Sequence, residues 1–217
     1  MILTLSANLN ILLRDQNSLL NAAGFDKQFD EEGLDSAKLN FIDNALSYML
    51  ESHEPFPMVV MDATYNLVAS NKSANKILEL FVLNPSALTD KVNLLEMIFH
   101  PDLCRPFVED WEKTAHMMLA RLHRESLEKR HDDRLQNLLN TILALPDVPK
   151  AWRQPDFSDD FYPTSTLTLC KGDLRLSFLM TMTTFSPPQS ITVEELMIES
   201  YFPLDAETKK ACIELCN

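Results

Sequence analysis

The spacing of apolar residues changes along this chain, and the change limits the folds that the chain can adopt. Most of the first 145 residues repeat apolar side chains every three or four positions, which is the period of an amphipathic helix. From Leu167 the period becomes two, because apolar residues then alternate with polar ones through Leu174, Leu176, Phe178, Met180 and Met182. Helices are therefore expected to come first and antiparallel strands last.

Five segments have the pattern of strands. Met58 to Asp62 and Leu67 to Ser70 flank a polar turn and predict a hairpin. A second hairpin is expected on either side of Lys171-Gly172, and Ile191 to Phe202 is expected to form a last strand. Together the segments predict an α+β fold with one five-stranded antiparallel sheet and helices on one side.

Helices are expected in most of the remaining sequence. Two short helices are predicted within residues 1–24, and others over 35–52, 72–82 and 92–99. The longest follows Pro106 and carries Val108, Trp111, Ala115, Met118 and Leu122 on one face. A further helix is expected from Leu135 to Leu145, and a short one follows Pro203.

Composition restricts the partners and the location of the chain. The formal net charge is −13, so the chain as a whole repels DNA, and its basic residues near Arg124 are interleaved with acidic ones. No run approaches the ~20 apolar residues that a membrane span needs. The four cysteines include no CxxC pair, which favours reduced thiols and a cytoplasmic protein. Cys212 and Cys216 lie one helical turn apart, a spacing that favours packing over a metal or redox role.

Sequence motifs for catalysis are missing. Three isolated glycines, Gly24, Gly33 and Gly172, cannot form a GxGxxG or P-loop phosphate site. The five histidines form no HExxH or HxH pair, and no serine lies in a GxSxG motif. Paired carboxylates such as Asp159-Asp160 are neighbours in sequence, so their side chains point in different directions. We therefore expect no enzyme, no metal site and no cofactor, although a site assembled from distant residues remains an alternative.

The methionine content is the one positive signal for a ligand. Ten methionines occur, and several lie on elements that are expected to face each other. Methionine adapts to irregular apolar surfaces, so these side chains could line a pocket for a flexible apolar molecule. Taken alone, the same content is more typical of an ordinary core.

Several short motifs, in order, resemble the MmyB-like regulators of the XRE family of helix-turn-helix proteins. Leu12 to Phe25 resembles the segment that joins the DNA-binding domain to the sensor domain in that family. Marks of the sensor follow almost to the end of the chain: His53-Glu-Pro-Phe-Pro, Tyr65-Asn-Leu-Val-Ala-Ser-Asn71, His100-Pro-Asp, Asp110-Trp-Glu, Trp152 and Leu196 to Asp205.

The resemblance implies a PAS-like ligand-binding domain over 34–217. Residues 1–33 would be the remnant of a helix-turn-helix domain and its linker helices, with the DNA-reading helices outside this chain. In part of the family the pocket is similar to a fatty-acid site. This sequence departs from the family pattern at Tyr65, where tryptophan is usual, and in the acidic loop that contains Asp156, Asp159, Asp160 and Phe161.

The expected function is ligand-dependent transcription regulation. A small apolar ligand such as a fatty acid would shift the packing of sheet and helices, and the N-terminal helices would relay the shift to DNA through the missing domain, in a homodimer. His116 and Arg121 are the candidates for holding an acidic head group. The alternatives are a dimerisation or interaction domain without a ligand and an enzyme of another type. The predicted ligand-binding residues are Met58, Val60, Trp111, His116, Met118, Arg121, Trp152, Phe178, Met180 and Met182.

Overall fold

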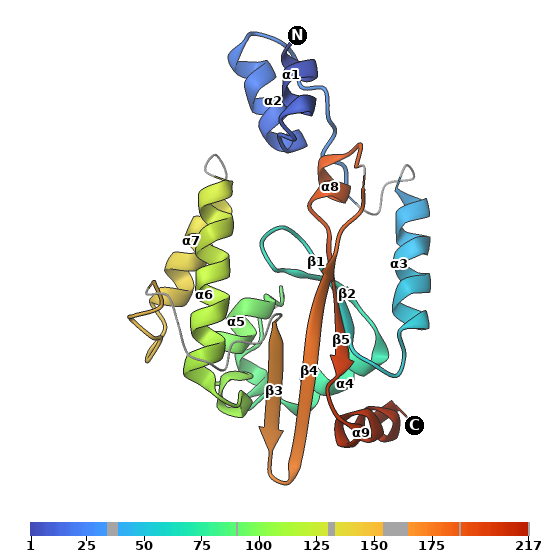
Figure 1. The fold of residues 1–217 in the computed structure, drawn as a ribbon, viewed down its shortest axis with the longest axis vertical. Helices are drawn as coiled ribbons and strands as arrows, with labels where there is room; N and C mark the ends of the chain where they lie inside the picture. Colours follow the sequence, from blue (N-terminus) through green and yellow to red (C-terminus); the bar gives the residue numbers. More distant parts are fainter. Residues whose placement is uncertain (34–38, 90, 130–132, 154–164, 187, 217) are drawn as a thin grey trace.

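The structure is a computed structural model that describes residues 1–33, 39–89, 91–129, 133–153, 165–186 and 188–216. A central antiparallel sheet is surrounded by helices, and the N-terminal helix pair lies at one end of the molecule (Figure 1). The helices are α1 Ile2–Asn8, α2 Leu13–Ala22, α3 Asn40–Ser52, α4 Lys72–Leu80, α5 Leu94–Phe99, α6 Trp111–Glu128, α7 Asp133–Leu143, α8 Ile191–Glu194 and α9 Ala206–Cys216. Two short 3-10 helices are η1 Pro85–Ala87 and η2 Arg105–Phe107.

The sheet contains β1 Met58–Met61, β2 Leu67–Ser70, β3 Thr166–Lys171, β4 Leu174–Thr183 and β5 Met197–Pro203. The strand order is β2-β1-β5-β4-β3, and the pairings are antiparallel. The last strand in the sequence is therefore the central strand of the sheet. Glu199 on β5 lies between Val59 on β1 and Met182 on β4.

Apolar side chains cover both faces of the sheet. On one face, Val59 and Met61 pack with buried residues of α5, α6 and α7. On the other face, Met58, Val60 and Ile198 pack against α3, which Figure 1 shows on the opposite side of the sheet from α6 and α7. The predicted α+β fold with a five-stranded antiparallel sheet is confirmed. Within it, α3 is an exception to the expected placement of helices on one side.

Asparagine side chains position the two helices next to the first hairpin. The Asn71 amide oxygen accepts hydrogen bonds from the backbone N–H groups of Ala74 and Met58, at 3.0 and 3.1 Å, and caps α4 while fixing the start of β1. Asn93 caps α5 in the same way and donates from its amide to the carbonyl of Thr64 at 2.8 Å. Both helices are thus fastened to the hairpin by local polar contacts.

The prediction of one strand from Ile191 to Phe202 was wrong in its first part. Ile191–Glu194 forms the short helix α8, and β5 begins only at Met197. Backbone hydrogen bonds define the helix, because the N–H groups of Glu194 and Glu195 donate to the carbonyls of Ser190 and Ile191, each at 3.0 Å. The carboxylates of Glu194 and Glu195 instead reach α2, where Glu194 accepts from the backbone N–H of Leu13 at 2.8 Å.

The other predicted elements appear close to their expected positions, including two short N-terminal helices and both hairpins. The predicted acidic loop with Asp156, Asp159, Asp160 and Phe161 lies outside the described residues. No helix in the described part of the chain is long and apolar enough to cross a lipid bilayer.

Candidate ligand-binding site

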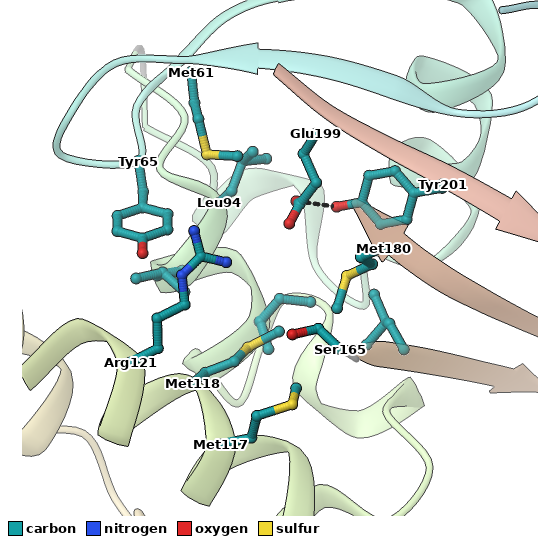
Figure 2. Close-up of a pocket in the computed structure, with 13 residues that line it drawn as sticks. Met61, Tyr65, Leu94, Met117, Met118, Arg121, Ser165, Met180, Glu199 and Tyr201 are labelled. Carbon is teal, nitrogen blue, oxygen red and sulfur yellow. Dashed lines mark hydrogen bonds between the residues drawn. The ribbon is translucent and has the colours of Figure 1, made fainter. Parts of the chain in front are cut away.

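A cavity lies between the sheet and α6, with a volume of about 50 Å³. Its walls come from the first hairpin, α5, α6 and strands β3, β4 and β5 (Figure 2). Most of the lining is apolar, and methionine is its commonest residue. The lining residues are Met61, Tyr65, Leu94, Leu95, Ile98, Met117, Met118, Arg121, Ser165, Leu167, Met180, Glu199 and Tyr201.

The sheet contributes a carboxylate to this apolar space. Glu199 and Tyr201 are two residues apart on β5, so strand alternation directs both side chains to the same face. The Tyr201 hydroxyl donates a hydrogen bond to Oε2 of Glu199 at 2.7 Å. Both side chains are partly buried and line the cavity. Phe178 supports Tyr201 from the neighbouring strand through an edge-to-face contact, with ring centroids 5.9 Å apart.

Helix α6 contributes the positive charge. Figure 2 shows Arg121 extending from α6 toward the sheet, with Tyr65 on one side and Glu199 on the other. Nε of Arg121 donates to Oε1 of Glu125 at 2.8 Å, and the Tyr65 hydroxyl donates to the other oxygen of Glu125 at 2.7 Å. The Arg121 guanidinium carbon also lies 5.6 Å from the centre of the Tyr65 ring, within the range of a cation–π contact.

Burial shifts the protonation of these groups. It raises the pKa of Glu199, and the hydrogen bond from Tyr201 and the charge of Arg121 offset this effect only in part. The pKa of Tyr201 rises for the same reason, and the nearby Glu199 charge raises it further. Burial alone would lower the pKa of Arg121, but Tyr65, Glu125 and Glu199 outweigh it and raise the pKa. Arg121 and both tyrosines therefore keep their protons at neutral pH.

Tyr65 reaches the cavity from a turn with unusual backbone geometry. Its φ of 65° lies in the left-handed region, which bulky residues rarely adopt. Backbone hydrogen bonds hold it there: its N–H donates to the carbonyl of Asp62 at 3.0 Å, and its carbonyl accepts from Leu94 at 2.9 Å. The turn therefore couples the hairpin to α5 and directs the ring toward α6.

The structure brings three of the predicted ligand residues to the cavity wall, Met118, Arg121 and Met180. Phe178 and Met182 lie on the same face of β4 but behind or beside the wall, because Phe178 packs on Tyr201 and Met182 pairs with Glu199. Trp111 packs edge to face on Phe99 with centroids 5.0 Å apart and does not line the cavity.

The other four predicted residues do not line the cavity either. Met58 and Val60 point to the opposite face of the sheet, toward α3. His116 precedes Arg121 by five residues, and at 3.6 residues per turn this spacing places the two side chains on different sides of α6. Trp152 is buried in the core beside α7, where its ring contacts His123 at a centroid distance of 5.0 Å.

Sequence reasoning missed Glu199, Tyr201 and Tyr65 as site residues. The alternation along β5 contained a signal for the first two, because Met197, Glu199 and Tyr201 share one face and a carboxylate is unusual on a buried face. Tyr65 was recognised only as a departure from a family pattern. No group of three potential metal ligands occurs in the described ranges, and the four cysteines form no disulfide.

The cavity, the sheet and the helices around it fall within one region of similarity to known proteins. No curated protein matches the chain. The family model of the MmyB-like transcription regulator ligand binding domain matches residues 42–215, which is most of the chain. The match begins within α3, ends within α9 and includes every residue that lines the cavity. The chain therefore belongs to the family of the MmyB-like transcription regulator ligand binding domain.

Proposed function

We propose that this chain is the sensor module of a cytoplasmic DNA-binding regulator of the XRE type, and not an enzyme. In this proposal a small molecule with an apolar body binds in the cavity between the sheet and α6. Binding changes the position of the N-terminal helices, and a helix-turn-helix domain outside these residues carries the change to DNA. The observation that carries the proposal is a methionine-lined cavity that contains two charged side chains, Arg121 and Glu199.

The lining supports a ligand of variable shape. Met61, Met117, Met118 and Met180 come from three different elements and meet around the same space. Methionine side chains have three rotatable bonds, so they can move aside for a larger molecule. A fatty acid is one candidate, and Arg121 is the lining residue that would bind its carboxylate. An engineered cavity of about 150 Å³ holds benzene, so the cavity must enlarge to admit a chain of that kind.

The segment just before β5, the strand that carries Glu199, contacts the N-terminal helices. Glu195 lies at the end of α8, two residues before β5 begins, and its Oε1 accepts from Nε of Arg14 on α2 at 2.6 Å. Arg134 on α7 donates to the same carboxylate at 3.2 Å. A ligand that displaces β5 or α7 would therefore move the carboxylate of Glu195, which binds Arg14 on α2. The contact between Glu195 and Arg14 is the proposed relay between ligand and DNA.

The charge of the chain supports a separate DNA-binding part. A net charge of −13 opposes contact with phosphates, so DNA contacts are assigned to the helix-turn-helix domain. The N-terminal helices also expose Leu5, Leu9, Leu12 and Leu19. These side chains favour association of the α1–α2 pair with that domain or with a second copy of the chain in a homodimer.

The first experiment is extraction of the purified chain under denaturing conditions, followed by mass spectrometry of the small molecules released. We expect a compound with an apolar body in a fixed ratio to the protein. A panel of fatty acids, alcohols and amides should also raise the unfolding temperature of extracted and refolded protein. A blank extract together with no thermal shift across the panel contradicts ligand binding.

The relay has its own test, in hydrogen exchange of α2 amides with and without the extracted compound. In the wild-type chain, ligand should change the exchange of residues 13–22. Glu195→Gln removes the ion pairs to α2 and α7, so the same ligand should bind but change α2 much less. Glu207→Gln, an exposed change of equal charge on α9, is the matched control. Equal responses in all three proteins would exclude Glu195 as the relay.

The exposed leucines favour one alternative, a dimerisation domain without a ligand. Light scattering of the wild-type chain and of Leu9→Ser measures the contribution of this surface to association. If the chain is a dimer that Leu9→Ser dissociates, and the extract contains no ligand, the dimerisation function is the better description.

A further inference from the structure

We infer that this site selects ligands whose polar group donates a hydrogen bond, as an alcohol, an amide or an ammonium group does, over ligands that end in a carboxylate. Glu199 is the residue that would accept this hydrogen bond. The inference rests on the proposed function, because it treats the cavity as the sensor site. It differs from the fatty-acid candidate in the chemistry of the head group.

The first support is an unused acceptor that faces the cavity. Oε2 of Glu199 receives the Tyr201 hydroxyl at 2.7 Å, while Oε1 has no hydrogen-bond partner among the described residues. A carboxylate can accept about four hydrogen bonds. Protein atoms do not fully enclose Oε1, and Glu199 lines the cavity. A ligand donor would satisfy this oxygen.

The second support is the balance of charge around the cavity. Among the described residues, the lining contains one cation and one carboxylate, Arg121 and Glu199. Arg121 is already paired with Glu125 at 2.8 Å. Arg121, Glu125 and Glu199 together therefore carry one excess negative charge whenever Glu199 is ionised. A ligand carboxylate would add a second negative charge. Two carboxylates in one poorly solvated site oppose each other, and one of them must take up a proton.

The third support is the position of Glu199 in the sheet. It lies on the central strand, and its cross-strand neighbours Val59 and Met182 are apolar. A buried charge is costly unless hydrogen bonds satisfy it. Burial raises the pKa of this carboxyl, which is the sign of an incompletely compensated charge. An O–H or N–H group of a ligand would donate the hydrogen bond that Oε1 of Glu199 lacks among the described residues.

The test uses four probes with the same short six-carbon chain, which limits how far the cavity must enlarge: hexan-1-ol, hexanamide, hexylamine and hexanoate. Their affinities are measured by calorimetry at pH 7.5, with the unfolding temperature as a second readout. We expect the three donors to bind the wild-type chain about tenfold or more tightly than hexanoate, the range of a hydrogen bond to a charged group. Hexylamine, which adds a positive charge, should show the largest margin.

Glu199→Gln keeps the shape of the side chain and removes its charge. The variant should reduce the preference for hexylamine over hexanoate to near one, while hexan-1-ol and hexanamide still bind. Glu79→Gln makes the same change on the exposed side of α4 and should leave the wild-type preferences unaltered. Circular dichroism confirms that both variants fold, so a lost preference is not a lost structure.

The outcomes separate the inference from the proposed function. If hexanoate binds as tightly as the donors or more tightly, and Glu199→Gln changes nothing, the inference fails while the sensor function stands. Loss of hexanoate binding in Arg121→Gln would then assign the head group to an acid. If none of the four probes binds the wild-type chain, both the inference and the cavity as a sensor site are overturned.

Discussion

The two faces of strands β1 and β5 use the same backbone for different purposes. The face toward α3 is a continuous apolar cluster that includes Met58, Val60 and Ile198. The face toward α6 borders the cavity, whose lining includes four methionines, an arginine and a carboxylate. The face toward α3 is densely packed, whereas the face toward α6 borders a cavity lined by flexible and charged side chains.

Two consecutive residues carry this contrast on β5. Ile198 is 1% exposed and packs under α3, whereas Glu199 points into the cavity. Strand alternation alone separates the two environments by one residue. Substitutions at neighbouring positions should therefore have different consequences, and this difference can be measured.

The largest effect is expected on the packed face. Ile198→Ala removes a fully buried side chain, so the free energy of unfolding should fall by about 2–5 kcal/mol. Urea denaturation followed by circular dichroism measures the loss. Ligand affinity of the folded fraction should stay within a factor of about two. A loss below about 1 kcal/mol would mean that the α3 face is not the tightly packed one.

A smaller effect on stability is expected at the cavity wall. Met118 is only partly buried and already borders open space, so Met118→Ala should cost about 1 kcal/mol. The enlarged cavity should shift preference from hexan-1-ol toward octan-1-ol, which calorimetry detects. If stability falls as far as in Ile198→Ala and the preference does not move, Met118 belongs to the core and not to a binding wall.

The smallest effect, and one of opposite sign, is expected at Glu199. Its folded-state pKa is raised, so its contribution to stability is fully present below the ordinary value of 4.5 and is lost as pH rises through the folded pKa. Glu199→Gln should therefore unfold at a higher temperature than wild type at pH 7.5, by about 2–4 °C for each kcal/mol recovered.

Scanning calorimetry at several pH values tests the sign of this effect. The gap between the two proteins should narrow as the pH falls toward 4.5, because wild-type Glu199 then becomes neutral as well. Arg121 and Tyr201, which face Glu199, keep their charge states over this range. A gap that does not depend on pH would show that the charge of Glu199 has no part in the difference.

Most of the fold could be predicted from the sequence because hydrophobic period and turn chemistry act locally. The alternation in β4 and the Lys171-Gly172 turn indicated the second hairpin, and the structure confirms it. The error at Ile191 to Glu194 arose where two apolar residues at spacing two fit a strand as well as one turn of helix. The contacts of Glu194 and Glu195 with α2 join residues 181 positions apart, and no local pattern reveals them.

The site was less predictable for a related reason. All four residues of β1 are buried, so their alternation could not distinguish the cavity face from the α3 face. The sequence therefore predicted Met58 and Val60 as site residues, whereas Val59 and Met61 are the ones that face α6. Methionine content and the expected facing of sheet and helices pointed to Met118, Arg121 and Met180. The pairing of β5 with β1 and β4, which brings Glu199 to the centre, depends on the complete sheet.

The left-handed backbone at Tyr65 makes the conformation of the first hairpin depend on contacts with the rest of the protein. Glycine would adopt this backbone without strain, whereas a tyrosine there costs about 1–2 kcal/mol. The hydroxyl bond to Glu125 on α6 and the backbone bonds to Asp62 and Leu94 offset this cost. Because Tyr65 also lines the cavity, the first hairpin owes its conformation in part to contacts made at the cavity wall.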